Sequence, residues 1–152
     1  MRESLRGALA RNELPDLAEA GLEDALRGLV ADWRVQLRSG PTLYLDITGD
    51  LTGMPDNVAA SLYRIAQELL TNALHHGRPN RIFLRLGRSE AGPRTVTLTL
   101  DDDGGGDVSR TASHTGRRLV GIRARLGALG GRFSLTGTGS GIRACASVPT
   151  AG

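Results

Sequence analysis

The chain has 152 residues and a net charge of only +3, and this length suits one domain built around a single core. The hydrophobic share is 39%, and no apolar run approaches the roughly 18 to 20 residues that a membrane span needs. Dispersed arginines with few aromatic residues argue against nucleic-acid binding, and the single cysteine excludes an internal disulfide. The chain has 21 glycines, and eleven of them cluster between Gly104 and Gly141, which indicates loops that let a ligand approach the backbone closely.

The N-terminal third predicts helix followed by one strand. Residues 1–38 are expected to be helical with a break at Pro15, because apolar residues recur at three- and four-residue spacing. Residues 43–47 alternate between apolar and polar as a strand does. The N-terminus lacks the continuous apolar core of a secretion signal, so we expect a cytoplasmic location.

A long helix is predicted from about Pro55 to His76. One apolar stripe runs along it, and Gly77 ends it. The stripe consists of Val58, Leu62, Ile65, Leu69 and Ala73.

The second half predicts two hairpins with a loop and a helix between them. Residues 81–86 and 95–100 alternate, as do residues 132–135 and 142–148. Between the two pairs, a polar loop leads into a helix near residues 119–129. This order of elements predicts an α+β fold, a mixed sheet with its helices on one face.

Three stretches carry residues suited to binding a nucleotide. On the long helix, Glu68 and Asn72 are four residues apart and share one face, where they could hold a metal ion or simply form a solvated helix edge. Asp102 to Gly106 follows a strand, so the carboxylate could accept a hydrogen bond from an exocyclic amine, although such a sequence is also a common turn. Gly116 to Gly121 turns from loop into helix and contains two arginines, Arg117 and Arg118, which suits an anion.

Taken together, these stretches resemble the ATP-binding catalytic domain of sensor histidine kinases, within the GHKL ATPase superfamily. Leu62 to His76 looks like the family's N box, and Asp102 to Gly106 looks like its first glycine box. Gly116 to Arg125 is similar to the second glycine box, and Gly137 to Arg143 to the closing hairpin. The resemblance covers about residues 20 to 149 and is closest to the nitrate-sensor-like and degradation-sensor-like subfamily. It implies a two-layer α/β sandwich of the Bergerat type, with ATP and Mg²⁺ as cofactors.

The resemblance implies a role for each matching residue. Asn72 would ligate Mg²⁺, and Glu68 would activate or orient the attacking imidazole or the metal-bound water. Asp102 would recognise the adenine amine, and His76 would either contact phosphate or pack at the helix end. The remaining nucleotide-binding residues would be Gly104, Gly106, Gly116, Arg117, Arg118, Leu119 and Gly121.

The chain departs from the family pattern in three places. Arg118 stands where the second glycine box has its second glycine, so an arginine contact would replace backbone approach to the phosphates. Asp107 stands where an apolar residue is usual, which suggests a looser lid over the nucleotide. No histidine stands in a helical dimerisation segment, since His75, His76 and His114 fall within the site or the lid.

We therefore expect residues 1–19 to be the stub of a dimerisation helix or a linker, and residues 20–152 to be the catalytic domain. The expected partners are a histidine-bearing dimerisation domain and a response regulator, and the chain would be cytoplasmic or the cytosolic part of a membrane-anchored sensor. Two alternatives stay open: a serine kinase of the anti-sigma-factor type, and a nucleotide-responsive binding module without kinase activity.

Overall fold

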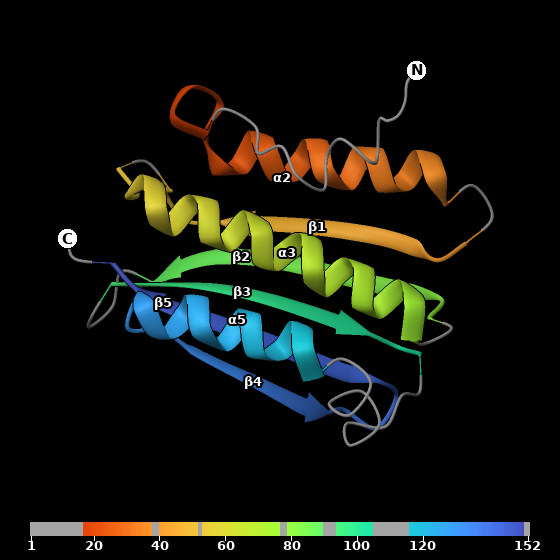
Figure 1. The fold of residues 1–152 in the computed structure, drawn as a ribbon. Helices are drawn as coiled ribbons and strands as arrows, with labels where there is room; N and C mark the ends of the chain where they lie inside the picture. The colour runs from red at the N-terminus through yellow and green to blue at the C-terminus, as the bar shows by residue number, and fades with distance from the viewer. Residues whose placement is uncertain are drawn as a thin grey trace.

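The computed structural model describes residues 17–37, 40–51, 53–76, 79–89, 94–104 and 116–150, and for residues 17–20, 75–76 and 116–119 it describes the backbone only. These residues form one layer of sheet and one layer of helices (Figure 1). The expected α+β sandwich, a mixed sheet with helices on one face, is confirmed.

The sheet has five strands in the order β1-β2-β3-β5-β4. β1 runs parallel to β2, and every other neighbouring pair is antiparallel. The parallel pair needs a long crossover, which α3 provides. The strands are β1 Thr42–Thr48, β2 Arg81–Ser89, β3 Thr95–Asp102, β4 Arg132–Gly137 and β5 Ile142–Pro149.

Three described helices cover one face of this sheet: α2 Leu17–Gln36, α3 Asp56–His76 and α5 Gly116–Ala128. α2 packs on β1 and α3, α3 crosses the middle of the sheet over β3, and α5 lies over β4 and β5 (Figure 1). None of the described helices is long and apolar enough to cross a membrane.

The alternation in the strands explains why one face is covered. On β2 and β3 every second side chain is buried under the helices, and the stripe of α3 packs onto that row. The buried row of these two strands consists of Ile82, Leu84, Leu86, Val96, Leu98 and Leu100. Leu62, Ile65 and Leu70 of α3 have no exposed surface, so the core lies between α3 and the centre of the sheet.

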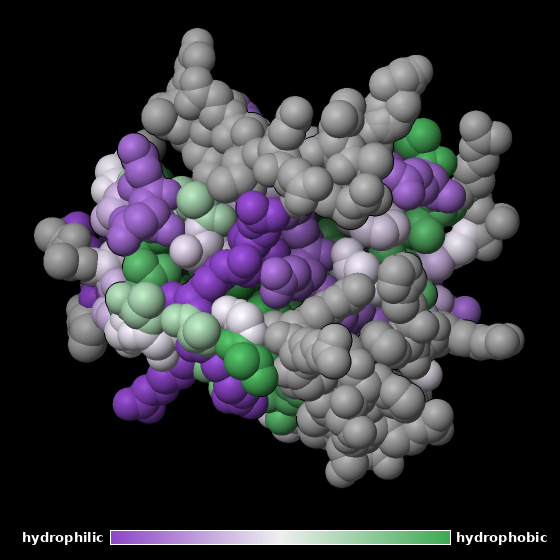
Figure 2. All heavy atoms as spheres, viewed as in Figure 1, coloured by the Kyte–Doolittle hydropathy of each residue, from purple (hydrophilic) through white to green (hydrophobic). Residues whose placement is uncertain are grey.

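The other face of the sheet is polar and carries no described helix. Threonines of β3 and arginines of β2 point to this face, and the rings of Tyr44 and Phe83 stack there with centroids 4.6 Å apart. Polar side chains on the helix side gather over the middle of α3, between α2 and α5 (Figure 2). A hydrophilic region therefore exists on both sides of the molecule.

The predicted elements lie where the sequence placed them, with ends that differ by a few residues. α5 begins at Gly116, at the start of the stretch expected to turn from loop into helix and three residues before the predicted helix at 119–129. One local feature was missed: Gly21 has φ 83°, a left-handed conformation that interrupts the helix within α2. The predicted helix before Pro15, the lid with Asp107 and His114, and Gly106 lie outside the described residues.

Candidate functional site

Glu68 and Asn72 lie on the edge of α3 that faces α5. Asn72 lies at the edge of the helix and has a polar amide side chain, yet only 7% of its surface is exposed. Glu68 is half-buried, and its Oε1 accepts a hydrogen bond of 2.8 Å from Nη1 of Arg125 on α5. The alternative of a solvated helix edge is therefore wrong, because this edge faces another helix.

The carboxylate of Glu68 is only partly satisfied. Its Oε1 is paired with Arg125, whereas its Oε2 is buried and has no hydrogen-bond partner among the described residues. A half-exposed ion pair contributes about 0 to 1 kcal/mol, and a buried acceptor left unpaired costs about 1 to 3 kcal/mol. Stability alone therefore does not explain this arrangement, and Oε2 is free to accept a hydrogen bond from a bound group.

Asp101 and Asp102 end β3 and Asp103 follows it, and the structure gives each of the three a different environment. Asp101 points to the open face, where its Oδ1 accepts from Nε of Arg143 at 2.6 Å and its Oδ2 lies 3.8 Å from Nη1 of Arg85. Oδ1 of Asp103 accepts from the backbone N–H groups of Asn80 and Arg81 at 2.7 and 2.9 Å. Both of these carboxylates are engaged within the protein.

Asp102 is the member of the three whose ionisation is penalised. Burial raises the pKa of its carboxyl above the ordinary value, and the neighbouring charges of Asp103 and Asp101 act in the same direction. Backbone hydrogen bonds from Gly104, at 2.9 Å, and from Ile142 oppose that shift without cancelling it. A carboxylate whose charged form is destabilised by burial is a candidate ligand-binding group.

Gly141 makes the closest backbone approach to Asp102. A Cβ atom placed on Gly141 would lie 1.9 Å from the carbonyl oxygen of Asp102 and 2.9 Å from its Oδ1. Only glycine fits at this position, where the turn between β4 and β5 reaches the end of β3. The turn between β4 and β5 therefore packs directly against Asp102.

The second glycine box forms the first turns of α5. Gly116 begins the helix, and Gly121 lies inside it with open space where a Cβ would be. The backbone of Arg117, Arg118 and Leu119 is helical, and their side chains lie outside the described residues, as does that of His76 at the end of α3. In Figure 1 the start of α5 and the ends of α3 and β3 lie on the same side of the molecule. α3 packs against both α5 and β3.

Sequence relatives of this chain are bacterial sensor kinases. It is 30% identical over 145 residues to the histidine-protein kinase/phosphatase UhpB of Salmonella typhimurium, an alignment that covers 95% of this chain and 27% of UhpB. It is 32% identical over 138 residues to the sensor histidine kinase ComP of Bacillus subtilis, covering 84% of this chain and 16% of ComP. The chain is a relative of the sensor histidine kinases. It spans about a quarter of UhpB and less of ComP, and no protein-family model matches it.

Solved structures of this family share the fold. The mycobacterial sensor histidine kinase MprB superposes with a TM-score of 0.60 at 17% identity, covering 90% of this chain and 95% of that one. The catalytic domain of the histidine kinase ThkA superposes with a TM-score of 0.62 at 11% identity, covering 86% and 92%. At such low identities the likeness establishes the fold of a histidine kinase catalytic domain.

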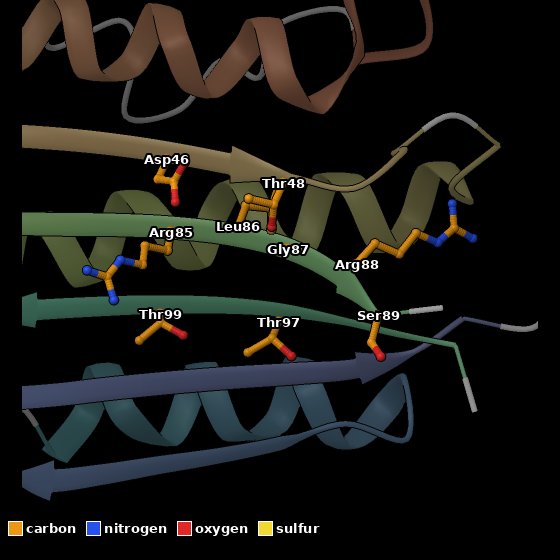
Figure 3. Close-up of a pocket in the computed structure, with 9 residues that line it drawn as sticks. All are labelled: Asp46, Thr48, Arg85, Leu86, Gly87, Arg88, Ser89, Thr97 and Thr99. Carbon is orange, nitrogen blue, oxygen red and sulfur yellow. The ribbon is translucent and has the colours of Figure 1, made fainter. Parts of the chain in front are cut away.

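Two hollows among the described residues lie on the open face of the sheet, away from Glu68 and Asn72. The first crosses β1, β2 and β3 and is lined largely by threonines and arginines, and none of its residues is among the predicted site residues (Figure 3). The second reaches the end of β3 at Asp102 and the turn at Thr138 and Ser140. Residues 105–115, between β3 and α5 in the sequence, lie outside the described residues.

Sequence reasoning missed two residues that the structure brings to the site. Arg125 had no assigned role, and nothing in the sequence signals its pairing with Glu68, which is 57 residues away. Gly141 was assigned only to the closing hairpin. A glycine just before a buried strand was the available signal, because such a residue often marks close backbone approach.

We predict that Gly141→Ala destabilises the fold, because the new methyl group collides with the backbone of Asp102. The expected loss in free energy of unfolding is about 1 to 3 kcal/mol, the range typical of overpacking. Gly28→Ala is the matched control, since Gly28 lies in α2 with no atom near its Cβ position and should gain up to about 1 kcal/mol. Urea denaturation measures both, and equal stability of the two variants would contradict the close approach.

We predict that Asp102→Asn and Asp103→Asn change stability in opposite directions. The raised pKa of Asp102 means that its contribution to stability is present below pH 4 or so and is lost as pH rises through its folded pKa. Asp102→Asn should therefore be more stable than wild type at neutral pH, with a difference that shrinks in acid. Hydrogen bonds from the backbone of Arg81 and Asn80 lower the pKa of Asp103, so Asp103→Asn should be less stable at neutral pH.

Thermal denaturation of each variant and of wild type at neutral pH and in mild acid measures both differences. A loss of stability in Asp102→Asn at neutral pH would show that its charge is not penalised in the folded chain.

Proposed function

We propose that this chain is the ATP-binding catalytic domain of a two-component sensor histidine kinase, which presents the γ-phosphate of ATP to a histidine on a dimerisation domain. The relatives support the activity, and the fold of histidine kinase catalytic domains supports the location of the site. The observation that carries the proposal is the edge of α3, where Asn72 is buried and one oxygen of Glu68 is unpaired.

The donors on α3 fit Mg²⁺ bound together with a nucleotide. Mg²⁺ prefers oxygen ligands, keeps several waters, and in nucleotide sites takes only one or two protein ligands besides phosphate oxygens. Asn72 would provide the amide oxygen, and no group of three or more His, Cys, Asp or Glu side chains among the described residues offers an alternative metal site. When bound, the ion would neutralise phosphate charge.

Glu68 would act on the group that approaches the phosphate. Its unpaired Oε2 can accept a hydrogen bond from an N–H of the attacking imidazole or from a water, which orients that group for attack. Phosphoryl transfer depends mainly on positioning and charge neutralisation, so a fixed acceptor on a rigid helix suits the reaction.

Asp102 would recognise adenine through its exocyclic amine. The carboxylate is held by the backbone N–H of Gly104 and lies against Gly141, so its orientation is fixed before a base binds. A hydrogen bond donated by the amine would favour the charged form that burial disfavours. Gly104 and Gly106 would leave room for the base and ribose.

The start of α5 would contact the phosphates. The first backbone N–H groups of a helix have no partner within it, and the positive end of the helix dipole favours an anion. Gly116 and Gly121 would flank the phosphates, with Arg117, Arg118, Leu119 and His76 nearby. We place Arg118 among the phosphate contacts because a guanidinium pairs with phosphate oxygens.

The proposed partners are a histidine-bearing dimerisation domain and a downstream response regulator, as in two-component signalling. Residues 1–19 would be the end of a dimerisation helix or a linker, and residues 20–152 the catalytic domain. We propose a cytoplasmic location for the domain, and membership of the nitrate-sensor-like or degradation-sensor-like subfamily on the strength of the motif between Leu62 and Glu68.

We predict that Asn72→Ala abolishes Mg²⁺-dependent binding of ATP, because it removes the amide oxygen proposed to ligate the ion. Titration with a fluorescent ATP analogue, with Mg²⁺ and with a chelator, measures this. Thr71→Ala is the matched control, since the Thr71 hydroxyl donates to the carbonyl of Gln67 in the same helix and is not expected to reach the ion. Unchanged affinity of the Asn72 variant in Mg²⁺ would remove Asn72 from the metal site.

We predict that Asp102→Asn weakens ATP about 10- to 100-fold while leaving tripolyphosphate nearly unaffected, because the carboxylate contacts the base only. Competition of both ligands against the same fluorescent analogue gives the two affinities. Asp101→Asn should affect neither ligand, since Asp101 pairs with Arg143 on the open face. Equal losses for ATP and tripolyphosphate in Asp102→Asn would exclude adenine recognition by this residue.

A further inference from the structure

The ion pair between Arg125 and Glu68 joins two helices of the proposed site. Arg125 lies in the last turn of α5, and its Nη1 is 2.8 Å from Oε1 of Glu68 on α3. The side chains are 38% and 25% exposed, so water only partly screens the pair.

The geometry of the pair separates the two oxygens of Glu68. Arg125 makes an end-on contact through one nitrogen to Oε1, and it leaves Oε2 buried without a partner in the described part of the chain. A glutamate side chain has three rotatable bonds, and a contact that holds one oxygen restricts where the other oxygen can lie. Arg125 thereby determines where Oε2 offers its lone pairs.

α5, the helix that carries Arg125, is held in place by contacts with the core and with β4. Ile122 and Leu126 are buried in the core, and Arg123 binds β4 on the other side of the helix. Nη1 of Arg123 donates to the carbonyl oxygen of Phe133 at 3.2 Å, and its guanidinium lies 5.3 Å from the centre of the Phe133 ring. These contacts hold α5 against the sheet and thereby fix the position of Arg125 relative to α3.

We propose that Arg125 is a positioning residue for Glu68: it holds Oε1 so that Oε2 faces the group that attacks the phosphate. This inference rests on the proposed function. The same helix begins at Gly116 with the proposed phosphate-binding turn, so its placement fixes the phosphate contacts and the orientation of Glu68 together. A purely structural ion pair would leave both oxygens satisfied by protein or solvent.

The test measures phosphotransfer and nucleotide binding separately, in the full chain supplied with its histidine-bearing dimerisation domain. Arg125→Gln should lower the rate of histidine phosphorylation at saturating Mg-ATP by about 10- to 100-fold, the usual effect of losing a group that orients a reacting residue. Its affinity for a fluorescent ATP analogue should stay within about twofold of wild type, because Arg125 contacts Glu68 and not the nucleotide. Arg125→Lys should recover most of the rate, since one charged N–H donor suffices for an end-on contact.

A double variant tests whether Arg125 acts through Glu68. In a background of Glu68→Gln, adding Arg125→Gln should cause no further loss of rate, as expected of two residues that act as one unit. Arg27→Gln is the control: it removes the same charge and also breaks an ion pair, but that pair joins Arg27 to Glu23 within α2, so the rate should be unchanged.

Two results would overturn the proposal while leaving the proposed function intact. The first is a full rate in Arg125→Gln when Glu68→Gln is impaired. The second is a loss of analogue affinity in Arg125→Gln as large as its loss of rate, which would make Arg125 a nucleotide contact. If wild type neither binds the analogue nor phosphorylates histidine, the proposed function itself fails.

Discussion

The packing of α3 onto the inner row of the sheet is the interaction on which the rest of the structure depends. Leu62, Ile65 and Leu70 are fully buried in the core, and α3 packs against β3, so the helix can neither rotate nor slide without exposing apolar surface. Because Glu68 and Asn72 belong to the same rigid helix, the core fixes where a carboxylate and an amide lie. The proposed site on the edge of α3 is therefore positioned by the buried residues of the core.

The three aspartates at the end of β3 have the same side chain but make different contacts. Asp101 pairs with arginines on the open face, whereas Asp102 accepts a hydrogen bond from the backbone N–H of Gly104 and lies close to Gly141 in the turn between β4 and β5. Asp103 has left the strand and holds the start of β2 through backbone hydrogen bonds. Of these three identical side chains, Asp101 forms an ion pair, Asp102 is proposed to contact a ligand, and Asp103 binds the backbone at the start of β2.

Much of the fold was predictable from the sequence, because the apolar residues of each element repeat with the period of that element. The period of two in residues 81–86 and 95–100 predicted strands, and the stripe on residues 58–73 predicted a helix. The pairing of Glu68 with Arg125 was not predictable, since it depends on which strands neighbour each other and where the crossovers lie. The approach of Gly141 to Asp102 has the same origin. The roles of the site residues stay predictions, because the fold alone does not test them.

The central claim is that the edge of α3, the end of β3 and the start of α5 bind one nucleotide. The most direct test is a nuclear magnetic resonance titration of the ¹⁵N-labelled chain with Mg-ATP. If one nucleotide binds to all three segments, the side-chain amide of Asn72 and the backbone amides of Gly104 and Gly141 should show large shift changes, with Thr97 and Thr99 on the open face unaffected. Changes confined to Thr97 and Thr99, with Asn72 unmoved, would contradict the central claim.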